Sequence, residues 1–183
     1  YPANSKEQRD ERRRTMNGSE ILVDAIGRVK GSVHAAVRGL GSDQLATKPY
    51  ENGNTVAWLL WHLTRIQDDH VADAASFEQL WTSDGWCERF GLPFEPEATG
   101  YGQSSAEVAA VRADPELLLG YHDAVSARTV KWLGSITERE LDRVVDESWD
   151  PPVTLGVRLV SVIADDLQHA GQAADLRGML LAR

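Results

Sequence analysis

The sequence predicts an all-α fold, a four-helix bundle with a long connection between the second and third helices. Apolar residues recur at helical spacing in four segments, and no segment alternates convincingly between apolar and polar residues. The chain of 183 residues contains 42% hydrophobic and 26% charged residues, which is typical of one ordinary globular domain. Because a chain of this length can bury a sizeable core, it needs no metal ion to fold, and any metal site in it is free to serve a function.

The first two predicted helices lie before the long connection. The first covers residues 18–40, where apolar residues recur every three or four positions until Gly41 ends the pattern. The second covers residues 55–76, and we expect Asn54 to cap its N-terminus because asparagine is a favourable N-cap residue.

The connection, residues 77–103, is rich in glycine, proline and tryptophan. Loops of this length inside a compact domain are uncommon and often serve a function. Its aromatic side chains indicate a folded lid rather than a flexible linker. A third helix is predicted over residues 104–135, with a kink at Pro115 because proline cannot donate the backbone hydrogen bond of a helix interior.

The remaining elements are a short turn of helix over residues 137–141, a loop over 144–152 and a long, strongly periodic last helix over 154–181. Residues 1–15 are predicted to form an N-terminal tail. Residues 16–183 are predicted to form a single domain.

Composition and charge exclude several classes of function. The net charge of -9 argues against a nucleic-acid-binding protein, which needs a surplus of lysine and arginine to neutralise phosphates. No apolar run approaches the ~18 residues that span a bilayer, and no signal peptide is visible, so we expect no membrane association and a cytoplasmic location. The single cysteine, Cys87, suits a reducing compartment, and its acidic neighbours should raise its thiol pKa and make it a poor nucleophile.

Three side chains on two helices have the pattern of a metal site. On the last helix Asp165 and His169 are four residues apart and therefore project from the same face, one turn from each other. On the second helix His62 lies among apolar side chains. Two imidazoles and a carboxylate suit Zn, Fe(II), Ni or Mn, and three protein ligands leave a position open for water or substrate.

The same spacing has a simpler explanation, a hydrogen bond between Asp165 and His169 within the last helix, with His62 satisfied separately. His70 is unsuitable as a further ligand, because eight residues place it about 12 Å from His62 along the helix axis, and Asp69 lies roughly 10 Å away. These two residues are expected either to line the mouth of a pocket or to lie on a solvated acidic helix face.

Two motifs resemble those of the DinB-like (YfiT-like) metalloprotein superfamily. The segment TVAWLLWHL, residues 55–63, followed by RIQDDH, is similar to the region of its first histidine. The segment DDLQHAGQ, residues 165–172, resembles its second signature, and Arg177 and Gly178 follow at a similar distance. Asp165 stands where relatives usually have histidine or glutamate, and Asp166 is the alternative carboxylate at the spacing i, i+3.

The resemblance implies a four-helix bundle, often a homodimer, that binds a divalent metal through His62, Asp165 and His169. Zinc is the metal we expect first. Within the superfamily the chain looks closest to actinobacterial mycothiol-dependent S-transferases, which implies a role in detoxification; relatives use bacillithiol or isomerise maleylpyruvate. The use of 15 arginines against 4 lysines also favours a GC-rich, actinobacterial genome.

The implied reaction is the attack of a metal-activated cosubstrate thiol on a small electrophile, with no nucleophile from the protein. We expect Asp166 and Gln172 to hold the imidazoles. The side chains expected to contact the thiol or the electrophile are Trp61, Asp69, His70, Trp81, Trp86 and Arg177. The alternatives are an isomerase or hydrolase with the same ligands and an added general base, or a non-catalytic metal-binding stress-response bundle with a fourth ligand.

Overall fold

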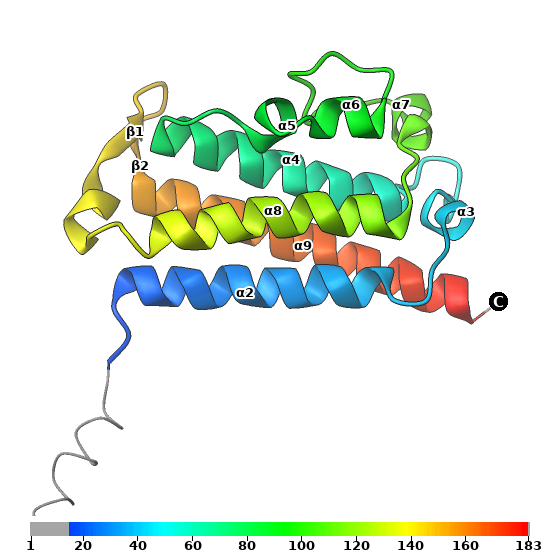
Figure 1. Cartoon of the computed structure of the whole chain (residues 1–183), viewed down its shortest axis with the longest axis horizontal. Helices are drawn as coiled ribbons and strands as arrows, with labels where there is room; N and C mark the ends of the chain where they lie inside the picture. Colours follow the sequence, from blue (N-terminus) through cyan, green and yellow to red (C-terminus); the bar gives the residue numbers. More distant parts are fainter. Residues whose placement is uncertain (1–14, 183) are drawn as a thin grey trace, which may run out of the picture.

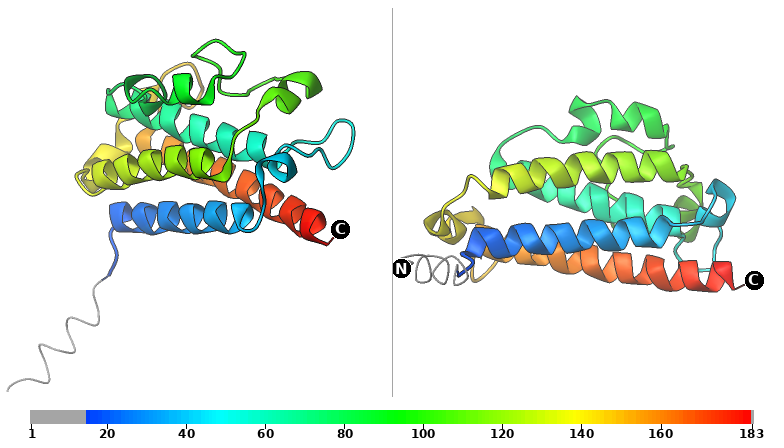
Figure 2. Two further views of the ribbon diagram at one scale, coloured as in Figure 1. Left: turned by 45° about the vertical axis from the view of Figure 1, so that its right-hand side comes forward. Right: turned by 60° about the horizontal axis from the view of Figure 1, so that its bottom comes forward.

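The computed structural model describes residues 15–182, so that residues 1–14 of the predicted tail lie outside the described residues. Four long helices run side by side along the longest axis of the molecule (Figures 1 and 2). They are α2 (Gly18–Val37), α4 (Val56–Ala75), α8 (Pro115–Leu133) and α9 (Leu155–Leu181). Helices α8 and α9 each pack against both α2 and α4. The predicted four-helix bundle is therefore confirmed.

Each long helix begins after a residue whose side chain accepts a hydrogen bond from a backbone amide of the first turn. These N-cap residues are Asn17, Thr55, Asp114 and Thr154. The prediction of Asn54 as the cap of α4 is wrong by one residue. Thr55 is fully buried, and its hydroxyl finds its partner in the amide of Trp58 at 3.1 Å.

The predicted helix over residues 104–135 is two helices, α7 (Ser105–Ala110) and α8, and the expectation of a single kinked helix is wrong. Pro115 starts α8 instead of bending a longer helix, since its fixed φ and missing N–H suit the first helical position. The connection between α4 and α7 contains two further short helices, α5 (Leu80–Ser83) and α6 (Trp86–Phe90), as expected of a folded segment. A short helix α3 (Ser42–Leu45) links α2 to α4 without having been predicted.

The predicted loop over residues 144–152 contains a strand. Strands β1 (Val144–Asp146) and β2 (Val153–Thr154) pair antiparallel, Val144 opposite Thr154, directly before α9. Strands this short carry too few residues to show an alternating pattern, and the all-α class stands. The predicted turn over 137–141 is the 3-10 helix η2 (Glu138–Asp142).

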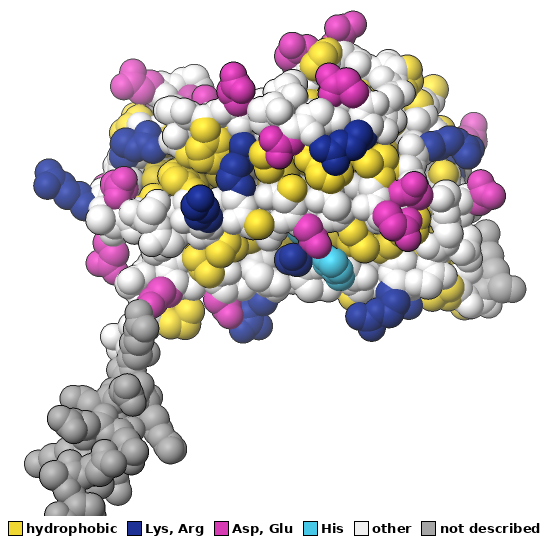
Figure 3. All heavy atoms as spheres, in the orientation of Figure 1, with side chains coloured by type: hydrophobic (Ala, Val, Ile, Leu, Met, Phe, Trp, Pro, Cys, Tyr) yellow, Lys and Arg dark blue, Asp and Glu magenta, His cyan; other side chains and the backbone are white. Residues whose placement is uncertain are grey.

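The bundle surface mixes charges of both signs. Figure 3 shows acidic and basic side chains interspersed with apolar ones over the face that α2 and α8 form. On these helices Asp123 accepts from His34 at 2.7 Å and pairs with Lys30 at 3.1 Å, a partner for His34 that its sequence position did not reveal. None of the helices in residues 15–182 is long and apolar enough to cross a membrane.

Candidate metal centre

The structure brings together the three predicted ligands. His62 projects from α4 and Asp165 and His169 from α9, and each offers a ligand atom within 4.8 Å of the other two. The two imidazole rings lie 4.9 Å apart between centroids. Asp165 and His169 also approach each other, with 3.5 Å between Oδ1 and Nε2, but His62 belongs to the same group. The contact within α9 that the simpler explanation expects is thus present, and His62 lies beside it as a third potential ligand.

The donor atoms fit a divalent cation. Asp165 Oδ2 is buried and has no hydrogen-bond partner among the described residues, which is costly for a carboxylate oxygen unless a cation lies beside it. Burial opposes ionisation of Asp165, but the hydrogen bond to His169 and the nearby imidazoles outweigh it and lower its pKa. Two histidines and one ionised carboxylate are a donor set that Zn and related divalent ions take in proteins.

The neighbouring carboxylate, Asp166, lies in a different environment. Its side chain is fully buried, and burial, followed by the charge of Asp165, raises its pKa well above the usual range. Among the described residues no hydrogen bond joins Asp166 to an imidazole. The structure therefore places Asp165, and not Asp166, beside both histidines.

Hydrogen bonds fix which nitrogen each histidine presents. His62 Nδ1 lies 2.6 Å from the carbonyl oxygen of Thr99, and because a carbonyl only accepts, Nδ1 carries the proton and Nε2 keeps its lone pair. His169 Nδ1 lies 3.2 Å from Gln172 Oε1, where Gln172 was expected, so Nε2 is left for the ion there as well. The ring of Trp58 stacks on His62 at 4.7 Å between centroids.

The two imidazoles differ in their electrostatics. Burial lowers the pKa of His62, which favours the neutral form that binds metal. The hydrogen bond that His169 donates to Asp165 raises the pKa of His169, which favours protonation of the imidazole and so opposes metal binding.

A cavity opens beside the three ligands. Its volume is about 250 Å³, and its lining includes His62, Asp165 and Tyr101. A larger cavity of about 670 Å³ adjoins it, since His70 and Arg158 line both. Together they provide space for a small molecule that reaches the metal site at one end.

The larger cavity is predominantly acidic. Its lining contains the carboxylates Asp69, Asp73, Glu78 and Glu97. The cation Arg158 is already paired with Asp146 at 2.7 Å and contacts His70 Nδ1 at 3.2 Å. Asp69 and His70 both line this larger cavity, which is one of the two placements expected for them, and His70 also lines the smaller cavity beside His62 and Asp165.

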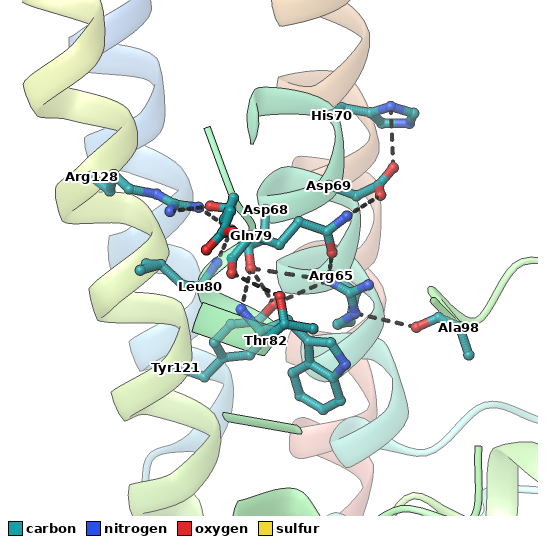
Figure 4. Close-up of polar contacts among 12 residues, drawn as sticks. Arg65, Asp68, Asp69, His70, Gln79, Leu80, Thr82, Ala98, Tyr121 and Arg128 are labelled. Atoms are coloured by element: carbon teal, nitrogen blue, oxygen red, sulfur yellow. Dashed lines mark hydrogen bonds and ion pairs between the residues drawn. The ribbon is translucent and has the colours of Figure 1, made fainter. Parts of the chain in front are cut away.

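A buried ionic network that sequence reasoning missed fastens the connection to the bundle (Figure 4). Asp68 of α4 is fully buried and accepts hydrogen bonds from the backbone amides of Leu80 and Trp81 at the start of α5. It also accepts from the Tyr121 hydroxyl at 2.9 Å and from the Arg128 guanidinium, both on α8. One carboxylate thus ties α4, α5 and α8 together.

Arg65, one turn before Asp68, holds the same connection at two further points. Its Nη1 donates to Gln79 Oε1 at 2.8 Å and its Nε to the Ala98 carbonyl at 3.2 Å. Arg65 and Asp68 are both fully buried, but their partners are distant in the sequence, so the sequence carries no local signal of this network.

Four predicted substrate contacts are placed elsewhere. Trp61, Trp81 and Trp86 are buried in the main apolar cluster, where the two connection tryptophans pack on Tyr121 at 5.3 and 5.5 Å, and none of the three lines either cavity at the metal site. A connection of this length needs its own apolar anchors, and these rings supply them. Arg177 donates to the Arg38 carbonyl at 2.6 Å and lines neither cavity at the metal site.

Cys87 behaves as its neighbours predict. Its side chain is partly buried, and burial, followed by the charge of Glu88, raises its thiol pKa. A thiol of raised pKa carries little thiolate at neutral pH, so it is a weak nucleophile.

Comparison with known proteins identifies the family of the chain. Residues 21–181 match the family model of the mycothiol-S-transferases. The chain belongs to this family. The predicted membership of the DinB-like superfamily is thereby confirmed.

Two known proteins are similar to this chain over most of its length. A protein of Geobacillus kaustophilus (strain HTA426), provisionally named metal-dependent hydrolase GK0616, is 31% identical over 156 residues, which cover 85% of this chain and 82% of that protein. A crystal structure of a conserved protein from Enterococcus faecalis superposes with a TM-score of 0.86 at 30% identity, covering 92% of this chain and 100% of that chain.

Proposed function

We propose that the protein is a metal-dependent S-transferase, which joins the sulfur of mycothiol, or of a related low-molecular-weight thiol, to a small electrophile. Its divalent ion, zinc in the first place, is held by His62, Asp165 and His169. The observation that carries the proposal is the convergence of these ligand atoms within 4.8 Å beside a cavity, in a chain of this family. A bound divalent ion lowers the pKa of a thiol that coordinates it, so that the thiol is nucleophilic at neutral pH.

The residues of the chain supply the remaining requirements. Thr99 and Gln172 contact the Nδ1 atoms of the two imidazoles, which would leave both Nε2 atoms to hold the ion, and Asp165 would offset part of its charge. Three protein ligands leave one position for the thiol. Cys87 lines neither cavity at the metal site and its pKa is raised, so we expect the nucleophile to come from the cosubstrate.

The acidic cavity suits the proposed thiol. Mycothiol carries a pseudodisaccharide, whose hydroxyl groups can donate hydrogen bonds to the carboxylates that line the cavity. Glutathione carries free carboxylates, which these same side chains repel. The lining therefore favours a neutral, polyhydroxylated thiol over an anionic one.

A hydrolase with the same metal ligands is the second candidate, and the name of the Geobacillus relative supports it. Hydrolysis needs a general base near the open metal position. His70 lines the cavity, and burial followed by the charge of Arg158 lowers its pKa. Its Nδ1 accepts from Arg158 at 3.2 Å, so this contact must break before His70 can act as a base. A non-catalytic site closed by a fourth ligand has less support, because the ligand group among residues 15–182 has three members.

Self-association as a homodimer is part of the proposal. The side chains of Val157, Val160 and Leu167 are exposed along one stripe of α9, an apolar surface that a second copy would cover. Light scattering of the purified protein tests it: a mass of one chain at micromolar concentration contradicts the dimer.

A conjugation assay tests the proposed reaction. Zinc-loaded protein is mixed with a fluorogenic alkylating electrophile and with mycothiol, bacillithiol or glutathione in turn. We expect the fastest catalysed conjugation with mycothiol, and a thermal stabilisation by mycothiol that requires the metal. Equal inactivity with all three thiols overturns the transferase, and turnover of an ester or amide in the absence of thiol favours the hydrolase.

A further inference from the structure

One stretch of the connection, residues 98–103, lies against the same face of α4 that carries the metal ligand. We call this stretch the strap. Three side chains of α4, spaced four and three residues apart, each donate a hydrogen bond to it. The pairs are Trp58 Nε1 with Gln103 Oε1 at 2.7 Å, His62 Nδ1 with the Thr99 oxygen at 2.6 Å, and Arg65 Nε with the Ala98 oxygen at 3.2 Å. The metal ligand His62 is the middle of the three.

Gly100 brings the strap backbone against the imidazole. Its φ is +98°, and a Cβ added there would lie 2.7 Å from His62 Nδ1 and 3.1 Å from the Trp61 ring. No side chain fits in that space. Gly102, two residues on, also has a positive φ of +72°, but a Cβ there would meet no heavy atom within 4 Å. Both glycines adopt a positive φ, which other residues rarely adopt, but only Gly100 also lies so close to His62 that a side chain would collide with it.

The imidazole of His62 is thus held on several sides. Trp58 stacks on its face with 12° between the ring planes, and Trp58 itself is tied to the strap through Gln103. The Thr99 carbonyl fixes the proton on Nδ1, and Gly100 packs against the same nitrogen.

We propose that the strap is part of the metal centre, with Thr99 and Gly100 as positioning residues that hold His62 in the tautomer and rotamer that present Nε2 to the ion. This inference rests on the proposed metal site but not on thiol transfer. Mutation of a residue that holds a metal-ligating histidine typically weakens metal binding 10- to 100-fold. Because coupling between two binding events is reciprocal, a bound ion stabilises the docked strap as much as the docked strap favours the ion.

The matched glycines provide the test. Zinc affinity is measured by competition with a chromophoric chelator for the wild type, Gly100→Ala and Gly102→Ala, and thermal unfolding of the metal-free proteins is recorded beside it. We expect Gly100→Ala to bind zinc about 10- to 100-fold more weakly and to change the visible spectrum of the cobalt-substituted protein. We expect Gly102→Ala to stay within about threefold of the wild type, since it adds backbone strain without a contact to His62. Equal affinities of the two variants overturn the proposal.

Hydrogen exchange supplies a second readout. Addition of zinc to the wild type should slow amide exchange in residues 98–103, and unchanged exchange there contradicts the coupling. If Gly100→Ala does not fold, Gln103→Ala takes its place, because this substitution removes only the hydrogen bond to Trp58. Gln103→Ala should weaken zinc binding. An unchanged zinc affinity would contradict the proposed role of the strap. A wild type that binds no zinc would instead overturn the metal site itself.

Discussion

Replacement of Asp68 by alanine should cost about 3–5 kcal/mol of the free energy of unfolding, the range for removing one partner of a buried ion pair. Asp68 and Arg65 are both fully buried, and 4.0 Å separates the carboxylate from the guanidinium. Without Asp68, Arg65 loses this ion pair while it stays buried. The Arg128 guanidinium, the Tyr121 hydroxyl and the first amides of α5 lose their acceptor as well. Unfolding free energies of domains are about 5–15 kcal/mol, so the variant retains only a fraction of its stability.

Urea unfolding followed by circular dichroism measures this loss. Asp73→Ala is the control, because Asp73 belongs to the same helix and is exposed; it should change the free energy by less than about 0.5 kcal/mol. Asp68→Asn keeps the shape of the side chain and one acceptor oxygen, so its loss of unfolding free energy should lie between those of Asp73→Ala and Asp68→Ala. A loss below about 1 kcal/mol for Asp68→Ala would refute the role of this network in fastening the connection.

Burial lowers the pKa of His122 to about 4, while its ordinary value of 6.5 applies to the unfolded chain. The free energy of unfolding should therefore fall by roughly 3 kcal/mol as the pH drops from about 6.5 to 4, and His122→Gln should remove this part of the pH dependence in urea titrations. The raised pKa of His169 makes a proton compete with the ion, so zinc affinity should fall up to tenfold per pH unit below that pKa; a flat competition titration between about pH 5 and 8 contradicts this. Glu97→Gln should lower the preference for mycothiol over glutathione several-fold at low salt, whereas Glu95→Gln, outside the cavity lining, should leave it unchanged; equal ratios would remove charge as the basis of thiol choice.

The sequence predicted those parts of the fold in which apolar residues recur at a regular spacing. Burial on one side of a helix recurs every three to four residues, which is why the long helices could be recognised from their periodicity. The pairing of Asp165 with His169 follows from helix geometry alone. The meeting of both with His62 followed from the expectation that bundle helices turn their polar positions toward a shared interior site.

The remainder depends on partners that are distant in sequence. Asp68 acquires its role from Tyr121 and Arg128, more than 50 residues away, and no local spacing indicates such contacts. Trp81 and Trp86 were expected to contact the thiol or the electrophile because aromatic groups suit a sugar-binding pocket, but as the large apolar groups of the connection they are buried and hold it in place. Thr99 contributes through its backbone carbonyl, which every residue type possesses, so its identity carries no signal.

His62, Asp165 and His169 are proposed to bind one divalent ion. The direct test is the metal content of the purified protein, measured by mass spectrometry after incubation with Zn, Ni, Fe(II) or Mn and desalting. The wild type is compared with His169→Ala and with the control His34→Ala. His34 is a suitable control because it pairs with Asp123 outside the site. We predict about one ion per chain for the wild type and the control. His169→Ala should bind almost none while its circular dichroism spectrum keeps the helix content of the wild type. No stoichiometric metal in the wild type, or full retention in His169→Ala, would contradict the account.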